Sequence, residues 1–264
     1  MKRGLIYGLA AVIVLGAIGG AVFLAWTFIG GGSGEASAPI SAPTLALNTA
    51  TPLPQATAAE AAATEEVAPP AAPTEVQAGG EGTAVLYRIT PDESEVRFII
   101  HEELLNTPAT VVGRTDQVTG DIIADYSHPA NSQVGTIRIN ARTLLTDNEF
   151  RNRALRNQIL QSAQDAYEFI TFTPTTLEGL PESVTPGEPF SFQITGDLTV
   201  RDVTRPVTFT ATVTPVSEGR LEGTASAQVL RSDFGLTIPS VPGVANVTND
   251  VTLEIDFVAL AVES

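Results

Sequence analysis

The most constraining feature of this sequence is an alternation of apolar and polar residues with a period of two, from about residue 86 to residue 260. In one segment, Val96, Phe98 and Ile100 alternate with Glu95 and Arg97. Successive side chains of a β-strand point to opposite faces of its sheet, so the pattern predicts strands with one apolar face. About eight or more such strands can be placed, and no long helices separate them. Their connections must therefore be antiparallel.

A sheet of this size with one apolar face either packs on a second sheet or closes into a barrel, and the alternation does not distinguish the two. The inward positions mix aromatic residues with alanine and glycine. In a barrel, that mixture either leaves room for one ligand or interdigitates into a filled core. The candidate cavity-lining residues are Phe98, Ile100, Ile139, Phe192, Phe209, Ala211, Ala225, Ala227, Ile255 and Phe257.

Residues 146–172 begin with the one stretch of the alternating region that favours a helix. Thr146 followed by Glu149 has the spacing of a capping box, so we expect the helix to begin at Thr146. The apolar pair Leu155 and Ile159 lies nearly opposite Phe150, which predicts a helix packed between two surfaces. Expected i,i+4 ion pairs join Asp147 to Arg151 and Glu149 to Arg153.

Five sequence blocks resemble, in their order, the YceI-like family: SEVRFIIH, TDNEFRNRALRNQIL, YEFITFTPTTLEGLP, ITGDLTVRDVTRPVTF and RSDFG. The resemblance covers about residues 86–260, and the order of the blocks makes it specific. It implies an all-β fold, an antiparallel lipocalin-like β-barrel with one short helical insertion. It also implies a cavity that holds a polyisoprenoid chain, and therefore a binding protein rather than an enzyme.

Two polar residues are candidates for the mouth of such a cavity, His101 and Arg142. The family pattern also has a histidine where His101 ends its block, and a guanidinium can hold a pyrophosphate or a quinone head. The alternatives are a strand-end histidine bonded to a loop and arginines paired with neighbouring acids. The adjacent Glu102 and Glu103 are interpreted as solvated surface. No catalytic motif, metal-ligand set or cofactor fingerprint is found, and the chain has no cysteine.

The N-terminal residues predict a membrane anchor. Lys2 and Arg3 precede an apolar run of 25 residues, Leu5 to Ile29, which exceeds the roughly 20 needed to cross a bilayer. The next basic residue is Arg88, so the N-terminus is expected in the cytoplasm and the domain outside the cell membrane. Cleavage of a signal peptide after ASA at residues 36–38 is the alternative. Glycines repeat at multiples of four, as in a weak homodimer seam or simply as in many membrane helices: Gly4, Gly8, Gly16 and Gly20.

The chain therefore divides into three expected parts: a transmembrane signal anchor (1–30), an Ala/Pro/Thr/Glu-rich disordered linker (31–83) and a β-barrel domain (84–264). The net charge of -16 argues against nucleic acid as a partner. The expected function is a membrane-tethered, extracytoplasmic module that encloses an isoprenoid or another long-chain lipid. A structural or stress-associated surface domain with a filled core is the alternative.

Overall fold

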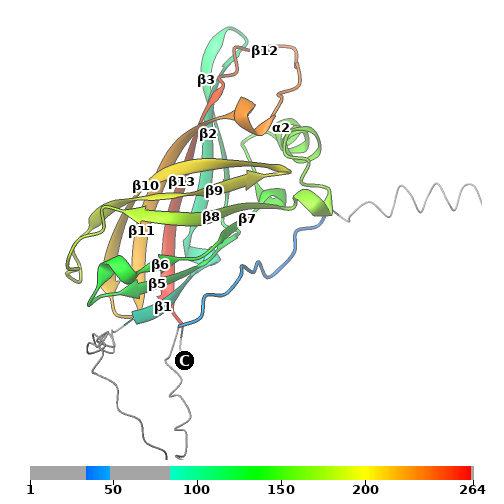
Figure 1. Cartoon of the computed structure of the whole chain (residues 1–264). Helices are drawn as coiled ribbons and strands as arrows, with labels where there is room; N and C mark the ends of the chain where they lie inside the picture. The colour runs from blue at the N-terminus through cyan, green and yellow to red at the C-terminus, as the bar shows by residue number, and fades with distance from the viewer. Residues whose placement is uncertain (1–33, 48–83, 263–264) are drawn as a thin grey trace, which may run out of the picture.

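The structure is a computed structural model that describes residues 34–47 and 84–262. In this part of the chain, an antiparallel sheet of 13 strands curls into a half-barrel that carries one short α-helix (Figure 1). The predicted all-β antiparallel architecture with a short helical insertion is confirmed. The elements are β1 (Ala84–Ile89), β2 (Glu95–Leu104), β3 (Thr107–Thr115), β4 (Val118–Thr119), β5 (Asp121–Asp125), β6 (Gln133–Val134), β7 (Ile137–Asn140), α2 (Glu149–Ala154), β8 (Phe169–Glu178), β9 (Phe190–Val200), β10 (Val203–Ser217), β11 (Arg220–Leu230), β12 (Val244–Ala245) and β13 (Asp250–Ala261).

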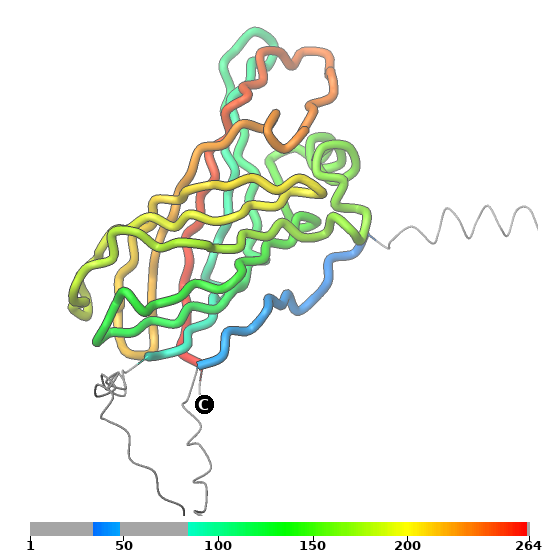
Figure 2. The backbone as a smooth tube through the Cα atoms, viewed as in Figure 1, coloured from blue at the N-terminus to red at the C-terminus, as the bar shows by residue number. Residues whose placement is uncertain are grey.

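The strand order explains the curl. It runs β4-β7-β8-β9-β10-β11-β13-β1-β5-β6, and only Gly120 separates β4 from β5 along the chain. The pairings of β5 with β1 and of β4 with β7 therefore lead round from one edge of the sheet to the other. β13 pairs with β11 along one edge, and along its other edge it pairs with β2 in its first half and with β1 near its end. The β2–β3 hairpin consequently extends beyond the strands that curl round the interior (Figure 2).

The two faces of the sheet follow the alternation in the sequence. Hydroxyl pairs connect neighbouring strands on the outer face, for example Thr195 with Thr208 and Thr199 with Thr204. Apolar side chains cover the inner face, and Gly223 makes room for one of them. A Cβ on Gly223 would lie 2.6 Å from the ring of Phe257, so only glycine allows the ring to lie over that strand.

The helix begins two residues later than its capping pattern predicts. The side chain of Asn148 is the cap, and its Oδ1 accepts from the backbone N–H groups of Phe150 and Arg151 at 2.9 and 3.1 Å. Thr146 instead donates to Oδ1 of Asn152 from its N–H and its hydroxyl, at 2.7 and 2.8 Å. The predicted capping box is therefore wrong, because the buried Asn152 side chain takes the hydroxyl that would have capped the helix.

The packing of the helix also differs from the expectation. Leu155 and Ile159, in the π-helical turn that follows α2, are buried, but Phe150 is 77% exposed. The helix therefore packs on one surface rather than between two. The expected ion pair of Asp147 with Arg151 is present at 2.6 Å. Among the described residues no ion pair joins Glu149 to Arg153, whose guanidinium lies 5.4 Å from the ring centroid of Phe150.

Residues 34–47 lie along the barrel as an extended segment, although they fall in the predicted disordered linker (Figure 2). Ile40 is buried, and Ser37 and Leu45 bond to Glu168 and Asp121 of the domain. The expectation of disorder does not hold for this stretch, because specific contacts offset the cost of ordering it. The predicted anchor and the rest of the linker fall outside the described residues. Within 34–47 and 84–262, no helix is sufficiently long and apolar to span a bilayer.

Candidate ligand cavity

The curled sheet encloses a cavity of about 620 Å³ whose lining is almost entirely apolar. Its volume falls in the range of roughly 300–1,000 Å³ that is typical of small-molecule sites. The interior is therefore not a filled core. Ala227 is the one candidate that does not line the cavity; it packs at the edge of the core cluster around Phe234. The nine candidates that do line it are Phe98, Ile100, Ile139, Phe192, Phe209, Ala211, Ala225, Ile255 and Phe257.

Small residues in adjacent strands create the space. Ala211 on β10 and Ala225 on β11 are directly opposite each other, and both are buried. Phe192 on β9 is the partner of Ala211 on the other side, and Ile255 on β13 is the partner of Ala225. Cross-strand partners point to the same face, so two alanines sit between two large side chains. The gap between those side chains is part of the cavity.

A pair of tyrosines lies at the end of the barrel where β1 and β5 meet. Tyr87 is fully buried, its hydroxyl lies 2.6 Å from that of Tyr126, and it donates to the carbonyl of Glu218 at 2.7 Å. Burial raises the pKa of Tyr87, and the hydrogen bond with Tyr126 adds to the shift. Burial also raises the pKa of Tyr126. Both rings therefore stay neutral and hold this end of the barrel together.

The opposite end, beside α2 and β12, is the mouth of the cavity. Three large apolar side chains that line the cavity are exposed there: Leu104, Phe150 and Val241. Apolar lining residues near the tyrosine pair, such as Pro129 and Val134, are buried or half-buried. An apolar ligand would therefore enter between α2 and the β12 segment.

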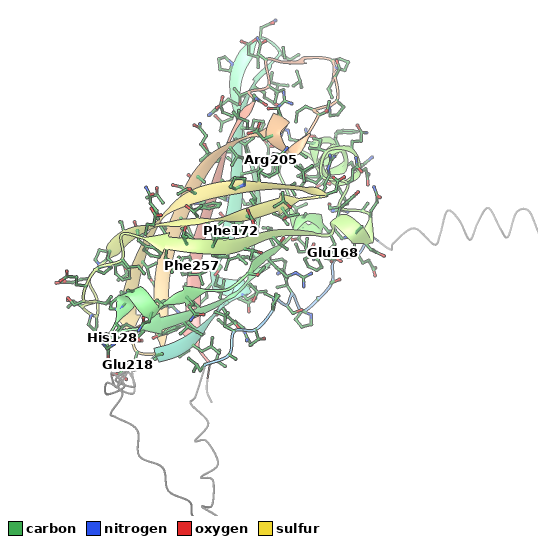
Figure 3. All side chains as sticks on the ribbon, viewed as in Figure 1. His128, Glu168, Phe172, Arg205, Glu218 and Phe257 are labelled. Carbon is green, nitrogen blue, oxygen red and sulfur yellow. The ribbon has the colours of Figure 1, made fainter. Side chains whose placement is uncertain are left out.

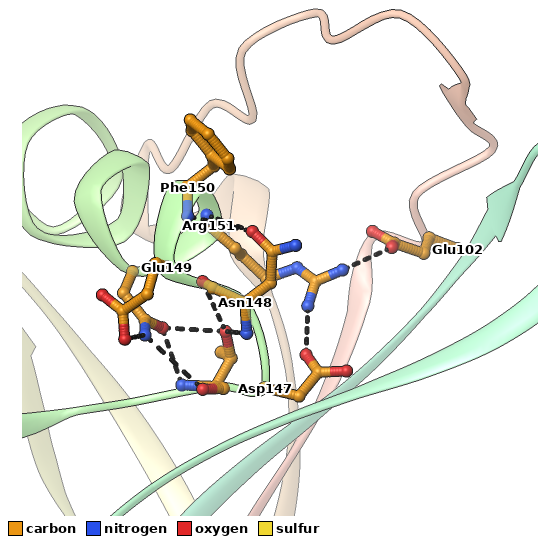
Figure 4. A network of polar contacts seen from close by, with 8 residues as sticks. Glu102, Asp147, Asn148, Glu149, Phe150 and Arg151 are labelled. Atoms are coloured by element: carbon orange, nitrogen blue, oxygen red, sulfur yellow. Dashed lines mark hydrogen bonds and ion pairs between the residues drawn. The ribbon is translucent and has the colours of Figure 1, made fainter.

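A polar network also lines the mouth (Figure 4). Arg151 donates to Glu102 at 2.9 Å and to Asp147 at 2.6 Å, so two carboxylates meet one guanidinium. This arrangement agrees with the interpretation that the helix arginines pair with neighbouring acids. The interpretation of Glu102 as solvated surface is wrong, since the residue is 8% exposed and lines the cavity. Its sequence signal was its position, which continues the inward series of Phe98 and Ile100 on β2.

The two candidate polar groups for the mouth lie elsewhere. His101 is exposed on β2, outside the cavity lining, and its Nδ1 is 3.1 Å from the hydroxyl of Thr110. Arg142 is 4% exposed and also outside the lining. It bonds to the carbonyl of Ser162 at 2.6 Å and pairs with Glu168 at 3.2 Å. Neither side chain lies at the mouth; Arg142 holds the segment after the helix, on the side of the barrel where Figure 3 labels Glu168.

Comparison with known proteins identifies the family. A family model described as the YceI-like domain matches residues 87–259, which is more than half of the chain. The chain belongs to the YceI-like family. The five sequence blocks that resemble this family all fall within the matched range, and the predicted family is confirmed. No curated protein gives a significant match.

Two solved structures share the fold of this YceI-like chain. One is a polyisoprenoid binding domain from Saccharophagus degradans implicated in plant cell wall breakdown, with 15% identity and a TM-score of 0.52. The similarity covers 67% of this chain and 99% of that one. The other is Burkholderia cenocepacia BcnA, with 15% identity, a TM-score of 0.50, and coverage of 64% and 98% respectively. At this level of identity the likeness supports the fold alone.

Proposed function

We propose that this protein is a membrane-tethered, extracytoplasmic binding module that encloses a polyisoprenoid or a similar long apolar lipid in a lipocalin-like cavity. The observation that carries the proposal is the apolar cavity of about 620 Å³, whose lining includes exposed apolar side chains beside α2 and β12. Burial of each CH₂ contributes roughly 0.8 kcal/mol, so a prenyl chain binds such a lining without a charged anchor. The similarity in fold to a domain described as polyisoprenoid binding supports the same ligand class.

The mouth favours a lipid with an uncharged head. Two carboxylates, Glu102 and Asp147, already pair with the guanidinium of Arg151. Arg231, which also lines the cavity, donates to the backbone carbonyls of Thr248 and Leu236. A phosphate or pyrophosphate placed there would meet two carboxylates, and like charges at close range repel. A quinone or an alcohol carries no such penalty. We therefore favour a neutral prenyl lipid over a prenyl phosphate.

A binding experiment on the cavity tests the ligand class. Replacing Ala225 by Phe fills the gap beside Ala211, so binding of a fluorescent prenyl alcohol should weaken at least about tenfold, equivalent to ~1.4 kcal/mol. Stability without lipid should hold, because the ring occupies empty space. The control is Ser226→Phe on the outer face of the same strand, which should change neither property.

A filled structural core predicts the opposite result. Ala225→Phe would then overpack the interior and lower the free energy of unfolding by about 1 to 3 kcal/mol. That loss, together with no prenyl binding by the parent protein, would overturn the proposal. Mass spectrometry of lipids that co-purify with the full chain provides an independent measurement.

The membrane placement rests on the apolar run Leu5 to Ile29 and the two basic residues before it. Protease added to intact spheroplasts should reach the domain and cut the Ala/Pro/Thr/Glu-rich segment before it. Detergent-permeabilised spheroplasts are the control for total cleavage. Protection of the domain until permeabilisation would contradict the extracytoplasmic placement.

A further inference from the structure

Four exposed apolar side chains surround the mouth of the cavity, and we name them the apolar rim: Leu104, Leu105, Phe150 and Val241. Three of them line the cavity itself. Leu105, which is 75% exposed, lies outside the lining, on the turn between β2 and β3. The rim therefore continues the apolar surface of the cavity outward to solvent. A surface of this kind marks an interaction site.

Three of the four rim residues lie on two segments without any charged residue, 104–113 and 236–249, in a chain whose net charge is -16. Phe150 lies on α2, between Glu149 and Arg151. The segments are joined to each other. Leu104 pairs with Val244, and the N–H of Leu105 donates to the carbonyl of Gly243 at 2.7 Å. Charged groups are the costliest to remove from water, so a tip without them can enter an apolar medium.

Residues 34–47, which we name the arm, fix where the chain arrives at the barrel. Ser37 donates from its N–H and hydroxyl to the carboxylate of Glu168 at 2.6 and 2.9 Å, and Arg142 donates to the carbonyl of Glu35 at 2.6 Å. Burial opposes ionisation of Glu168, but the bonds from Ser37 and Asn140 and the charge of Arg142 outweigh it and lower the pKa. The carboxylate is therefore charged at neutral pH, and the bonds that hold the arm persist.

The arm starts on the α2 side of the barrel and runs to the end where β1 begins (Figure 2). Its far part is held by Asp121, which accepts from the N–H of Leu45 at 3.0 Å and pairs with Arg88 of β1. Leu45 bonds to Asp121 and Ala84 pairs with Asp125, so the arm and the start of the domain meet at the same strand, β5. From the predicted anchor's end at residue 30 to residue 34 there are four steps, a reach of at most about 14 Å. With the proposed anchor in the bilayer, this short reach keeps the start of the arm next to the membrane.

We propose that the apolar rim rests in the surface of the bilayer that the anchor spans, so that the cavity opens directly onto the lipid acyl chains. This inference deepens the proposed function and rests on its membrane anchor. The exposed side chains of the rim suit the boundary between head groups and acyl chains, where apolar surface leaves water. A prenyl chain then passes between bilayer and cavity without crossing water.

Site-specific fluorescence tests the contact. The full chain has no cysteine, so Leu105→Cys carries a single thiol for an environment-sensitive fluorophore. In phosphatidylcholine vesicles we expect a blue-shifted emission that doxyl-labelled phosphatidylcholine quenches. The matched control is Val216→Cys, an exposed apolar position beside the β10–β11 turn at the opposite end. It should remain unshifted and unquenched.

Two outcomes would overturn the contact. Equal quenching at positions 105 and 216 would mean that the barrel has no preferred orientation. A blue shift at 105 without quenching by lipid would mean that protein, such as a second copy of the chain, covers the rim.

A transfer assay separates this inference from the proposed function. Leu105 has a φ of 52°, a conformation that asparagine tolerates, so Leu105→Asn should fold normally. Uptake of a prenyl alcohol from vesicles should slow about tenfold in this variant, with affinity in detergent solution unchanged. The control, Val216→Asn, should leave both the rate of uptake and the affinity unchanged. An unchanged rate of uptake by Leu105→Asn would contradict the docking surface alone. Absence of prenyl binding by the parent protein and by both variants would contradict the proposed function.

Discussion

The two ends of the barrel differ in the elements that form them and in what their side chains do. At the end near β1 and β5, Tyr87 is fully buried and bonds to Tyr126 and to the backbone at Glu218. At the mouth, Phe150 is exposed and the one buried acid, Glu102, depends on Arg151. The tyrosine end stabilises the fold. The mouth is less well packed, which leaves it accessible to a ligand. Binding sites commonly show this trade, because a surface that admits a ligand cannot also be fully packed.

The largest expected effect is at the tyrosine end. Tyr87→Ala removes a fully buried ring and should lower the free energy of unfolding by about 3 to 5 kcal/mol, as for other large aromatic truncations. Phe150→Ala is the same kind of change at the mouth and should stay within about 0.5 kcal/mol, because the ring is exposed. Urea titrations followed by circular dichroism measure both. Similar losses for the two variants would remove the distinction between the ends.

A smaller effect is expected from the ion pair at the mouth. Arg151→Ala leaves the buried carboxylate of Glu102 without its partner, which should cost about 1 to 3 kcal/mol. Adding Glu102→Gln to that variant removes the unpaired charge and should recover most of the loss. If the double variant is no more stable than Arg151→Ala in thermal unfolding, the pair does not hold the mouth.

The smallest effect concerns the helix beside the mouth. Asn148→Ala removes the cap and should lower the free energy of unfolding by about 1 kcal/mol. Asn148→Asp keeps an acceptor at the same place and should be neutral in urea titrations. A midpoint for Asn148→Ala equal to that of the parent would show that the helix does not need its cap.

The period of two predicted the antiparallel strands and the face that each side chain occupies, and the family resemblance predicted the barrel. Nine of the ten candidate residues line the cavity because strand alternation fixes which face each side chain points to. Ala227 shares that face and lies between two lining residues of β11, Ala225 and Val229, but packs in the cluster with Phe234. Alternation gives the face of a residue and not the side chains that it contacts. Arg142 was misplaced for a related reason: its partners Ser162 and Glu168 are distant in sequence.

The prediction of the helix start from local sequence was wrong because several polar side chains in this segment compete for the same hydrogen-bond partners. Thr146 has the right spacing for a cap, but Asn148 is an equally good cap and Asn152 occupies the hydroxyl of Thr146. The arm is a second case. Its composition predicts disorder on its own, and only the groups of Glu168, Arg142 and Asp121 on the folded barrel give it partners.

The sequence by itself determined the antiparallel β architecture, the inward set of side chains, the family and the apolar run that predicts an anchor, because each depends on patterns within short windows. Only the tertiary structure decided that the interior is open, that one end is sealed by tyrosines and the other lined by an ion pair, and that the arm lies along the barrel. Those features depend on the distances between strands that meet across the curl of the sheet, and no local pattern encodes such distances.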